Sequence, residues 1–176
     1  MTVPTTPAFI VPNATDWKDL IAHPVMAWMQ EYTRRFDKGE IQGLDFNTFC
    51  TSDLKYEKMD GTIWTGGERA WDAVLETYAP FKETKHAPSG TVVVWETEKG
   101  WEMMGQVTLW GDLKLPGDSL VVDSEGRAWD TAGPAMFHFK YVKDPEAPHG
   151  GLRISECKVC ADRAGTYQEM MKRGMV

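Results

Sequence analysis

The sequence offers three residues whose side chains could together move a proton. Asp37 ends a helical pattern in the segment RRFDKGE, Tyr56 lies in a short alternating run, and His86 stands alone ahead of a β-rich run. A histidine exchanges protons near neutral pH, and a carboxylate on one ring nitrogen fixes its tautomer. A tyrosine hydroxyl can donate to an oxygen on which negative charge develops. These residue types suffice for removing a proton next to a carbonyl group, and hence for dehydration, isomerisation or cyclisation without a cofactor.

Other kinds of catalytic site find little support in the sequence. The four histidines show no His-x-His or His-Glu-x-x-His spacing, so no metal site is expected. The absence of a Gly-x-Ser-x-Gly elbow and of a Gly-rich loop after a strand argues against a serine hydrolase and a nucleotide cofactor. Cys157 and Cys160 form a Cys-x-x-Cys pair, but their segment alternates like a strand, on which they point to opposite faces. Two separate structural cysteines are therefore favoured over a redox or zinc site.

The composition indicates a single domain with a sizeable core. Hydrophobic residues make up 42% of the 176 positions, with eight tryptophans and ten methionines among them. The formal net charge is −7, and because acidic and basic residues are interspersed, nucleic-acid binding is not expected. No apolar run approaches the ~20 residues of a membrane-spanning helix, and the N-terminal segment lacks the pattern of a signal peptide. Three cysteines, an odd number, make no disulfide framework, so we expect a reduced, cytoplasmic protein.

A long helix is predicted near the start of the chain. Pro24 suits its first turn, apolar residues recur at three- and four-residue steps as far as Phe36, and Gly39 suits its C-terminal end. The preceding residues 1–14 are rich in Pro and Thr and are expected to form an extended arm. Residues 15–176 are expected to form the single domain.

After this helix the pattern becomes mainly strand-like. A second helix over residues 65–80 follows an Asp60-Gly61 turn. Gly133-Pro134 is expected to form a bulge, because proline cannot donate to the ladder of a sheet. The other predicted elements are a short helical segment at 43–49, strands at 54–59, 91–97, 101–113, 128–142 and 152–161, and a polar loop at 114–127.

Helices followed by a long antiparallel meander imply an α+β fold. Such a sheet curls around one helix face and leaves an open-ended cavity. Asp162 can cap a C-terminal helix that carries Tyr167, Met170 and Met171 on one side. This helix either closes the mouth of the cavity or packs on a second subunit.

Residues 24–161 resemble the nuclear transport factor 2-like superfamily, in which a cone-shaped, curved antiparallel or mixed sheet wraps around N-terminal helices. The likeness rests on RRFDKGE, Tyr56, WTGGERAWDAVLETYAPF, His86 and the closing order AMFHFKYV…GLRISECKV. The chain is most similar to SnoaL-like proteins and to scytalone dehydratase, a fungal pigment-pathway enzyme. Its MMKRGMV ending and tryptophan-rich hairpin look like SnoaL-like proteins of filamentous fungi. The resemblance implies a role in secondary metabolism and a homodimer formed through the outer face of the sheet.

The resemblance also implies a site. By position, Asp37 matches the dehydratase residue that orients a histidine, His86 the histidine that moves a proton, and Tyr56 the tyrosine that polarises a carbonyl through a bound water. All three would then converge on one pocket. The chain departs from the dehydratase, because a second pocket histidine has no clear counterpart and a pocket asparagine falls near Met136. These losses argue against that particular substrate, although His138 shares a strand face with Met136 and could replace the histidine.

The leading hypothesis is a cofactor-independent lyase, isomerase or cyclase that acts on a hydrophobic, aromatic or polyketide-like small molecule. Two alternatives stay open: a non-catalytic ligand-binding or dimeric scaffold module of the same fold, and a protein-interaction adaptor. Each site residue also has a structural interpretation, with Asp37 bonded to its own backbone, His86 at a strand edge and Tyr56 in the core. Strand parity prevents all the candidates for the cavity wall from facing inward; they are Trp28, Met104, Trp110, Met136, Phe137 and His138.

Overall fold

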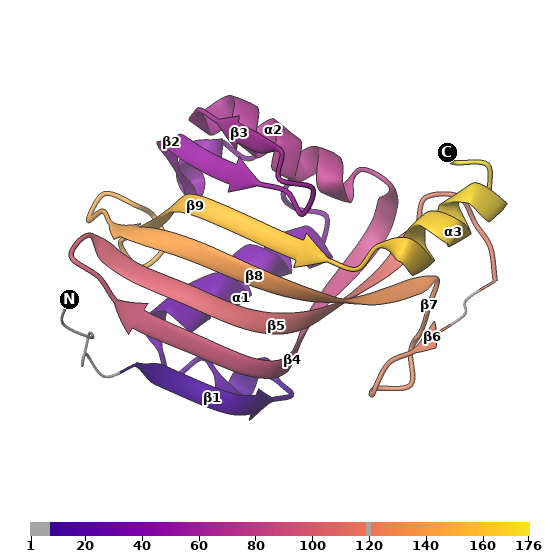
Figure 1. The fold of residues 1–176 in the computed structure, drawn as a ribbon, viewed down its shortest axis with the longest axis horizontal. Coiled ribbons are helices and arrows are strands. Elements are labelled where there is room, and N and C mark those ends of the chain that lie inside the picture. The colour runs from indigo at the N-terminus through magenta and orange to yellow at the C-terminus, as the bar shows by residue number, and fades with distance from the viewer. Residues whose placement is uncertain (1–7, 119–120) are drawn as a thin grey trace.

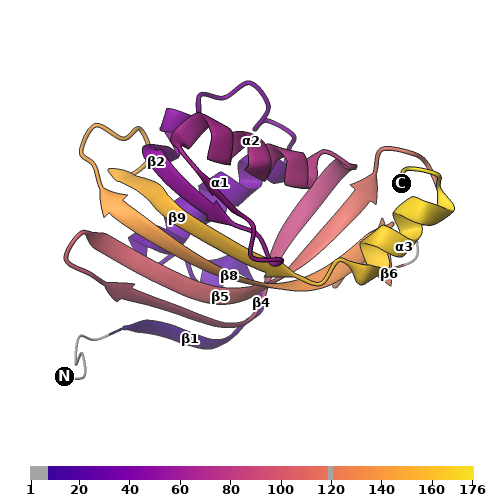
Figure 2. The ribbon, with the colours of Figure 1, turned by 45° about the horizontal axis from the view of Figure 1, so that its top comes forward.

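A curved sheet with two helices on one face forms the body of the molecule (Figures 1 and 2). The computed structural model describes residues 8–118 and 121–176. In chain order the elements are β1 (Phe9–Ala14), η1 (Trp17–Asp19), α1 (Pro24–Asp37), η2 (Phe46–Thr48), β2 (Cys50–Glu57), β3 (Ile63–Thr65), α2 (Gly67–Tyr78), β4 (Phe81–Glu96), β5 (Gly100–Leu113), β6 (Val121–Val122), β7 (Ala128–Trp129), β8 (Thr131–Lys143), β9 (Leu152–Ala161) and α3 (Ala164–Lys172).

The sheet is mixed, as predicted. Seven strands lie in the order β1-β4-β5-β8-β9-β2-β3, and β2 runs parallel to β9 while the other pairs are antiparallel. α1 packs on β4 and α2 on β2, so both helices cover the same face. α3 lies at the far end of the sheet, against β8 (Figure 1). This layout confirms the α+β fold with a curved mixed sheet around N-terminal helices. No helix in the described part of the chain has the length and apolar character needed to cross a membrane.

α1 forms for the reasons that the sequence predicts. Pro24 occupies its first turn, and the Nδ1 of His23 accepts the N–H of Val25 over 3.3 Å, which satisfies one of the free donors at the helix start. Beyond its C-terminus, Gly39 takes a φ of 65°, a conformation that suits glycine. The last helical residue is Asp37, which the packing of α1 on β4 brings against that strand.

β4 begins at Phe81 rather than near residue 91, so His86 lies within the strand and not ahead of it. Pro88 and Gly90, which signal a turn in the sequence, are instead absorbed in an irregularity of the β4–β5 pairing between Pro88 and Val92. Gly90 there has a φ of 146°, which only glycine adopts readily. The longer strand matters because it carries His86 along the inner face of the sheet.

Two further expectations about the strands need correction. The β5–β8 register runs unbroken through Gly133 and Pro134, so the predicted bulge is absent. Pro134 is tolerated because its backbone turns to the β9 side, where its carbonyl accepts the N–H of Asp162 over 2.9 Å just before the β8–β9 ladder begins at Ala135. The described part of the segment expected to form an arm is an edge strand, β1, which pairs with β4, and residues 1–7 lie outside the described residues.

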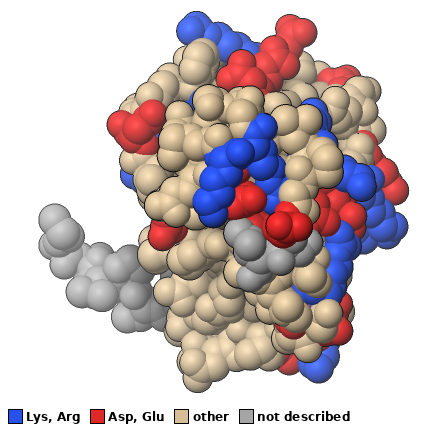
Figure 3. All heavy atoms as spheres, turned by 90° about the vertical axis from the view of Figure 1, so that its right-hand side faces the viewer, with Lys and Arg blue, Asp and Glu red and all other residues tan. Residues whose placement is uncertain are grey.

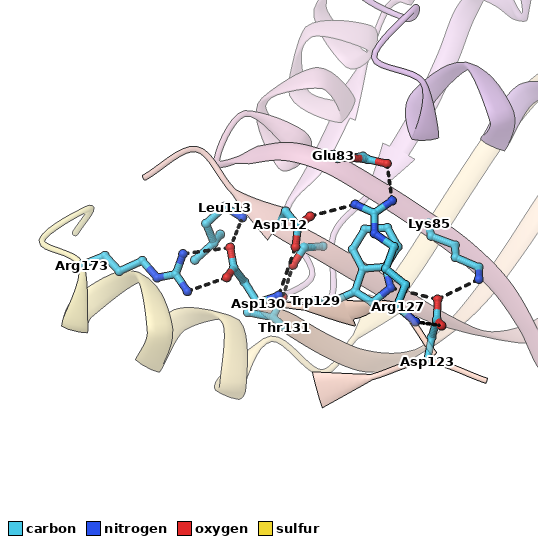
Figure 4. A network of polar contacts seen from close by, with 11 residues as sticks. Glu83, Lys85, Asp112, Leu113, Asp123, Arg127, Trp129, Asp130, Thr131 and Arg173 are labelled. Carbon is cyan, nitrogen blue, oxygen red and sulfur yellow. Dashed lines mark hydrogen bonds and ion pairs between the residues drawn. The ribbon is translucent and has the colours of Figure 1, made fainter. Parts of the chain in front are cut away.

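The C-terminal helix is held by ion pairs rather than by its apolar side chains. Arg173 binds Asp130 through two hydrogen bonds of 2.8 Å, and the two side chains are only 5% and 8% exposed. Glu169, one turn earlier, accepts a further bond from Arg173. Tyr167 and Met171, on the side of the helix expected to meet the cavity mouth or a second subunit, are exposed in the single chain. Burial of the charged pair therefore decides how this helix docks (Figure 4).

Candidate active site

Asp37 and His86 form a hydrogen-bonded pair where α1 meets β4. The Nδ1 of His86 lies 2.6 Å from Oδ1 of Asp37, and the backbone N–H of His86 donates to Oδ2 over 3.1 Å. The hydroxyl of Thr84 also donates to Oδ1. An ionised carboxylate only accepts, so it places the proton of a neutral imidazole on Nδ1 and leaves Nε2 with a lone pair. The partners of Asp37 lie on β4, which is not the self-capping arrangement considered for a surface residue.

The free nitrogen of His86 meets a second residue, Tyr78. The hydroxyl of Tyr78, at the end of α2, lies 2.9 Å from Nε2. Burial raises the pKa of this phenol above its usual range, so the hydroxyl keeps its proton near neutral pH and can donate to Nε2. Asp37, His86 and Tyr78 thus form a continuous row of hydrogen bonds. A proton that arrives at Nε2 makes the imidazole of His86 positively charged, and the carboxylate of Asp37 at Nδ1 stabilises this charge.

Tyr56 takes a different partner from the one that its expected role requires. Its hydroxyl lies 3.1 Å from that of Thr77, which in turn donates to the carbonyl of Ala73. Burial raises the pKa of Tyr56 as well, so this phenol is also a potential donor. Tyr56 and His86 border one cavity, whereas Asp37 stands behind His86 and does not line it.

The cavity that these residues border is apolar and small. Its volume is about 70 Å³, enough for a few water molecules but below the roughly 300 Å³ of common ligand pockets. The backbone at its edge is fixed by Trp17, whose Nε1 donates to the carbonyl of His86 over 3.0 Å. Helices, strands and the segment after β9 all contribute to the lining, which comprises Trp17, Met29, Tyr32, Thr33, Tyr56, Val74, Thr77, Tyr78, His86, Val107, Leu109, Ala135, Phe137, Phe139, Cys157, Val159, Ala161 and Arg163.

A second hollow adjoins this cavity on its outer side. We call it the vestibule; its volume is about 340 Å³, and it is lined by Tyr56, Lys58, Met59, Asp60, Glu76, Thr77, Val159, Ala161 and Arg163. Five residues line both spaces, namely Tyr56, Thr77, Val159, Ala161 and Arg163. Cavity and vestibule therefore lie side by side and share part of their lining.

Among the predicted wall residues, Phe137 lines the cavity and five others do not. Met104 and Met136 are 42% and 49% exposed on the outer face of the sheet. His138 shares that face, where its Nε2 lies 2.9 Å from Oε2 of Glu102, so it does not replace the missing pocket histidine. Trp110 follows the inward-facing Leu109 and so turns to the outer face.

Trp28 fails to line the cavity for another reason. It is buried in the core, with Nε1 donating to the carbonyl of Leu152 over 3.1 Å. Its helix presents other side chains to the cavity, namely Met29, Tyr32 and Thr33.

Two residues of the site, Tyr78 and Arg163, were not predicted from the sequence. Tyr78 falls within the helix predicted over residues 65–80 and was given no role in the site, although it lies one turn after Val74 and eight residues before His86 in the chain. Arg163 carried no motif, and its place follows from where β9 ends. In the described residues, no group of three or more His, Cys, Asp or Glu side chains is arranged to hold a metal ion.

Solved structures of other proteins share this fold. Aln2 from a Streptomyces species gives a TM-score of 0.58 at 16% identity, over 85% of this chain and 96% of its own. The hexachlorocyclohexane dehydrochlorinase LinA-type3 from Novosphingobium barchaimii gives 0.55 at 12% identity, over 83% and 89%. A protein of Novosphingobium aromaticivorans assigned as a scytalone dehydratase gives 0.56 at 11% identity, over 82% and 86%.

At such low identities the likeness establishes the fold alone. It confirms the cone-shaped α+β fold expected from the sequence, while the SnoaL-like or dehydratase-like branch stays a prediction. No model of a protein family and no curated protein matches the chain.

Proposed function

We propose that this protein is a cofactor-independent lyase, isomerase or cyclase that acts by proton transfer on a small hydrophobic, aromatic or polyketide-like molecule. One observation carries the proposal: the 2.6 Å contact between Asp37 and His86 at the wall of an apolar cavity. Structures with the same fold include proteins named for a dehydrochlorinase and a dehydratase, and both names describe eliminations. A reduced cytoplasmic location remains a prediction, supported by three free cysteines.

The proposed chemistry assigns one task to each polar residue. His86 accepts the substrate proton through Nε2 and returns it to the leaving group or to a second carbon. Asp37 holds the ring in the required tautomer and stabilises the imidazolium. Because the hydroxyl of Tyr78 occupies Nε2, the proton passes through this hydroxyl, which gives its own proton to His86 as it receives the one from the substrate. Tyr56 gives up its hydrogen bond to Thr77 and donates instead to the substrate oxygen on which charge develops.

The proposal can be tested without knowledge of the natural substrate. 5-Nitrobenzisoxazole is an aromatic probe whose ring opens in one step when a base removes its C–H proton and the N–O bond breaks, releasing a coloured phenolate. We expect the protein to accelerate this reaction and His86→Ala to reduce the rate at least about 10²-fold, the usual contribution of a general base. The melting temperature of the variant should stay within a few degrees of that of the parent.

The chain contains its own matched control. His138 also pairs with a carboxylate, that of Glu102, but on the outer face of the sheet. His138→Ala should therefore leave the rate unchanged. Equal losses in both variants, or an unchanged rate in His86→Ala, would remove His86 from the mechanism. Probe binding without any acceleration by the parent protein would instead identify a ligand-binding module.

A further inference from the structure

Arg163 occupies an unusual position among the charged residues of the site. It follows the last residue of β9 by two positions, precedes α3 and lines both the cavity and the vestibule. The other charged residues of the vestibule, Lys58, Asp60 and Glu76, do not reach the cavity. The charge nearest to the shared wall is therefore a guanidinium.

This guanidinium has no partner in the described part of the protein, which sets it apart from the other arginines. Arg69 lies over the ring of Trp64, at 5.2 Å from its centroid. Arg163 makes neither an ion pair nor a stacking contact there. The remaining five arginines of the sequence each pair with an acidic side chain: Arg34, Arg35, Arg127, Arg153 and Arg173.

Two charged side chains near Arg163, those of Asp60 and Lys58, already contact other groups of the protein. The carboxylate of Asp60 accepts the backbone N–H of Thr62 over 2.8 Å in the β2–β3 turn, and the ammonium of Lys58 lies 5.5 Å from the centroid of Trp64. The charge of Arg163 reaches inward, where it lowers the pKa of Tyr56 and Tyr78 against the larger effect of burial. A chain with a formal net charge of −7 disfavours anions as a whole, so the guanidinium at this wall supplies local positive charge that an anionic group could use.

We propose that Arg163 binds an anionic group of the ligand at the wall between cavity and vestibule, so that the ligands of this protein are small organic anions, such as aryl carboxylates, with their apolar end toward His86. The inference builds on the proposed function and names its substrate class. The small size of the cavity and the positive charge of Arg163 together support this inference. A ligand larger than the cavity of about 70 Å³ would lie against Arg163, which lines both hollows, and planar guanidinium groups pair well with carboxylates.

A pair of probes that differ only in charge tests this inference. Cinnamate and cinnamamide have the same shape, and isothermal titration calorimetry gives the Kd of each. We expect the parent protein to bind cinnamate roughly tenfold more tightly than cinnamamide, as one charge-assisted contact allows. Arg163→Gln should remove this preference by weakening cinnamate binding alone, and Arg163→Lys should retain part of it. Raising the salt concentration should weaken cinnamate binding more than cinnamamide binding.

Arg69→Gln is the matched control, because Arg69 is an arginine of α2 that lines neither cavity nor vestibule. It should keep the preference for cinnamate. The inference is overturned if the parent binds both probes equally, if it binds neither, or if Arg163→Gln keeps the preference. These experiments measure binding and not turnover, so their outcome is independent of the 5-nitrobenzisoxazole rates that test the proposed function. A preference for the anion with no proton-transfer activity would leave the inference standing while the proposed function fails.

Discussion

The hydroxyl of Tyr78 decides how a substrate could reach the base. It lies 2.9 Å from Nε2 of His86, so it either relays the proton or blocks the nitrogen until its side chain moves. We expect relay, and hence a loss of about 10²-fold in the rate of 5-nitrobenzisoxazole opening by Tyr78→Phe, since the ring stays and only the hydroxyl is removed. The rate should be measured over a range of pH, because loss of a relay lowers it throughout.

A matched substitution shows whether the effect belongs to the site. Tyr167→Phe makes the same chemical change at an exposed tyrosine of α3 and should leave the rate unchanged. A Tyr78→Phe variant that reacts as fast as the parent, or faster, would mean that the hydroxyl only shields Nε2. Tyr78 would then be a gate and not part of the proton path.

At the scale of elements, the end of the sheet opposite the N-terminus is held by buried and half-buried charges. Asp130 receives Arg173 from α3 and the backbone N–H of Leu113 from β5, and Asp112 receives Arg127 and the N–H of Asp130 (Figure 4). On the face at this end, acidic and basic side chains lie next to one another (Figure 3). The network ties the C-terminal helix to the strands.

The ion pair of Arg173 with Asp130 should make a measurable contribution to stability. Arg173→Met leaves a buried carboxylate without its partner, which should lower the free energy of unfolding by about 3–5 kcal/mol. Urea denaturation at pH 7 measures the loss. Arg34→Met is the control, because Arg34 pairs with Glu31 on the exposed face of α1 and such pairs contribute at most about 1 kcal/mol. Equal effects of the two substitutions would contradict a special role for the buried pair.

The difference in the free energy of unfolding between the parent and Arg173→Met should also depend on pH. Burial alone would raise the pKa of Asp130, but the hydrogen bonds from Arg173 and Leu113 hold it below its ordinary value. A carboxyl whose pKa is lowered in the folded state contributes stability above its unfolded pKa of about 3.9, and that contribution is lost as the pH falls through the folded value. The gap between parent and Arg173→Met should therefore be complete above about pH 5 and should shrink at lower pH. A gap that stays constant down to about pH 2 would show that the pair's charge contributes nothing.

The sequence indicated some elements well because local signals agreed with tertiary packing. Pro24 and Gly39 bracket α1, and Asp37 at its end was therefore placed correctly beside His86. The start of β4 was predicted wrongly because the β-rich run of the sequence begins only at Thr91, whereas pairing with β5 extends the strand back to Phe81 across an irregularity between Pro88 and Val92. Local propensity does not reveal such tertiary compensation.

At the scale of the whole molecule, the wall of the cavity was harder to predict than its polar pair. Strand residues alternate between faces, so an error of one position exchanges the inner and the outer set. Phe137 was placed inward and is so, but Met136 and His138 were proposed beside it and necessarily face outward. The partner of His86 on α2 escaped notice because a tyrosine on an apolar helix face looks like a core residue until the opposing strand is known.

The predicted homodimer would form through the outer face of the sheet. Met104 and Met136 are exposed there on neighbouring strands, beside the Glu102–His138 pair. We expect the protein to elute with twice the mass of one chain in size-exclusion chromatography with light scattering. The double substitution Met104→Lys and Met136→Lys should shift it to the mass of one chain, because burying two new ammonium groups in an interface is costly.

Met171→Lys introduces the same charge at an exposed methionine of α3, away from this face, and should leave the assembly intact. A monomeric parent protein would count against the resemblance on which the dimer rests, while the polar site would keep its geometry within one chain. A dimer that survives the double substitution but not Met171→Lys would instead place the interface on α3. In that case the exposed side chains of Tyr167 and Met171 would be explained by a second subunit rather than by the fold of one.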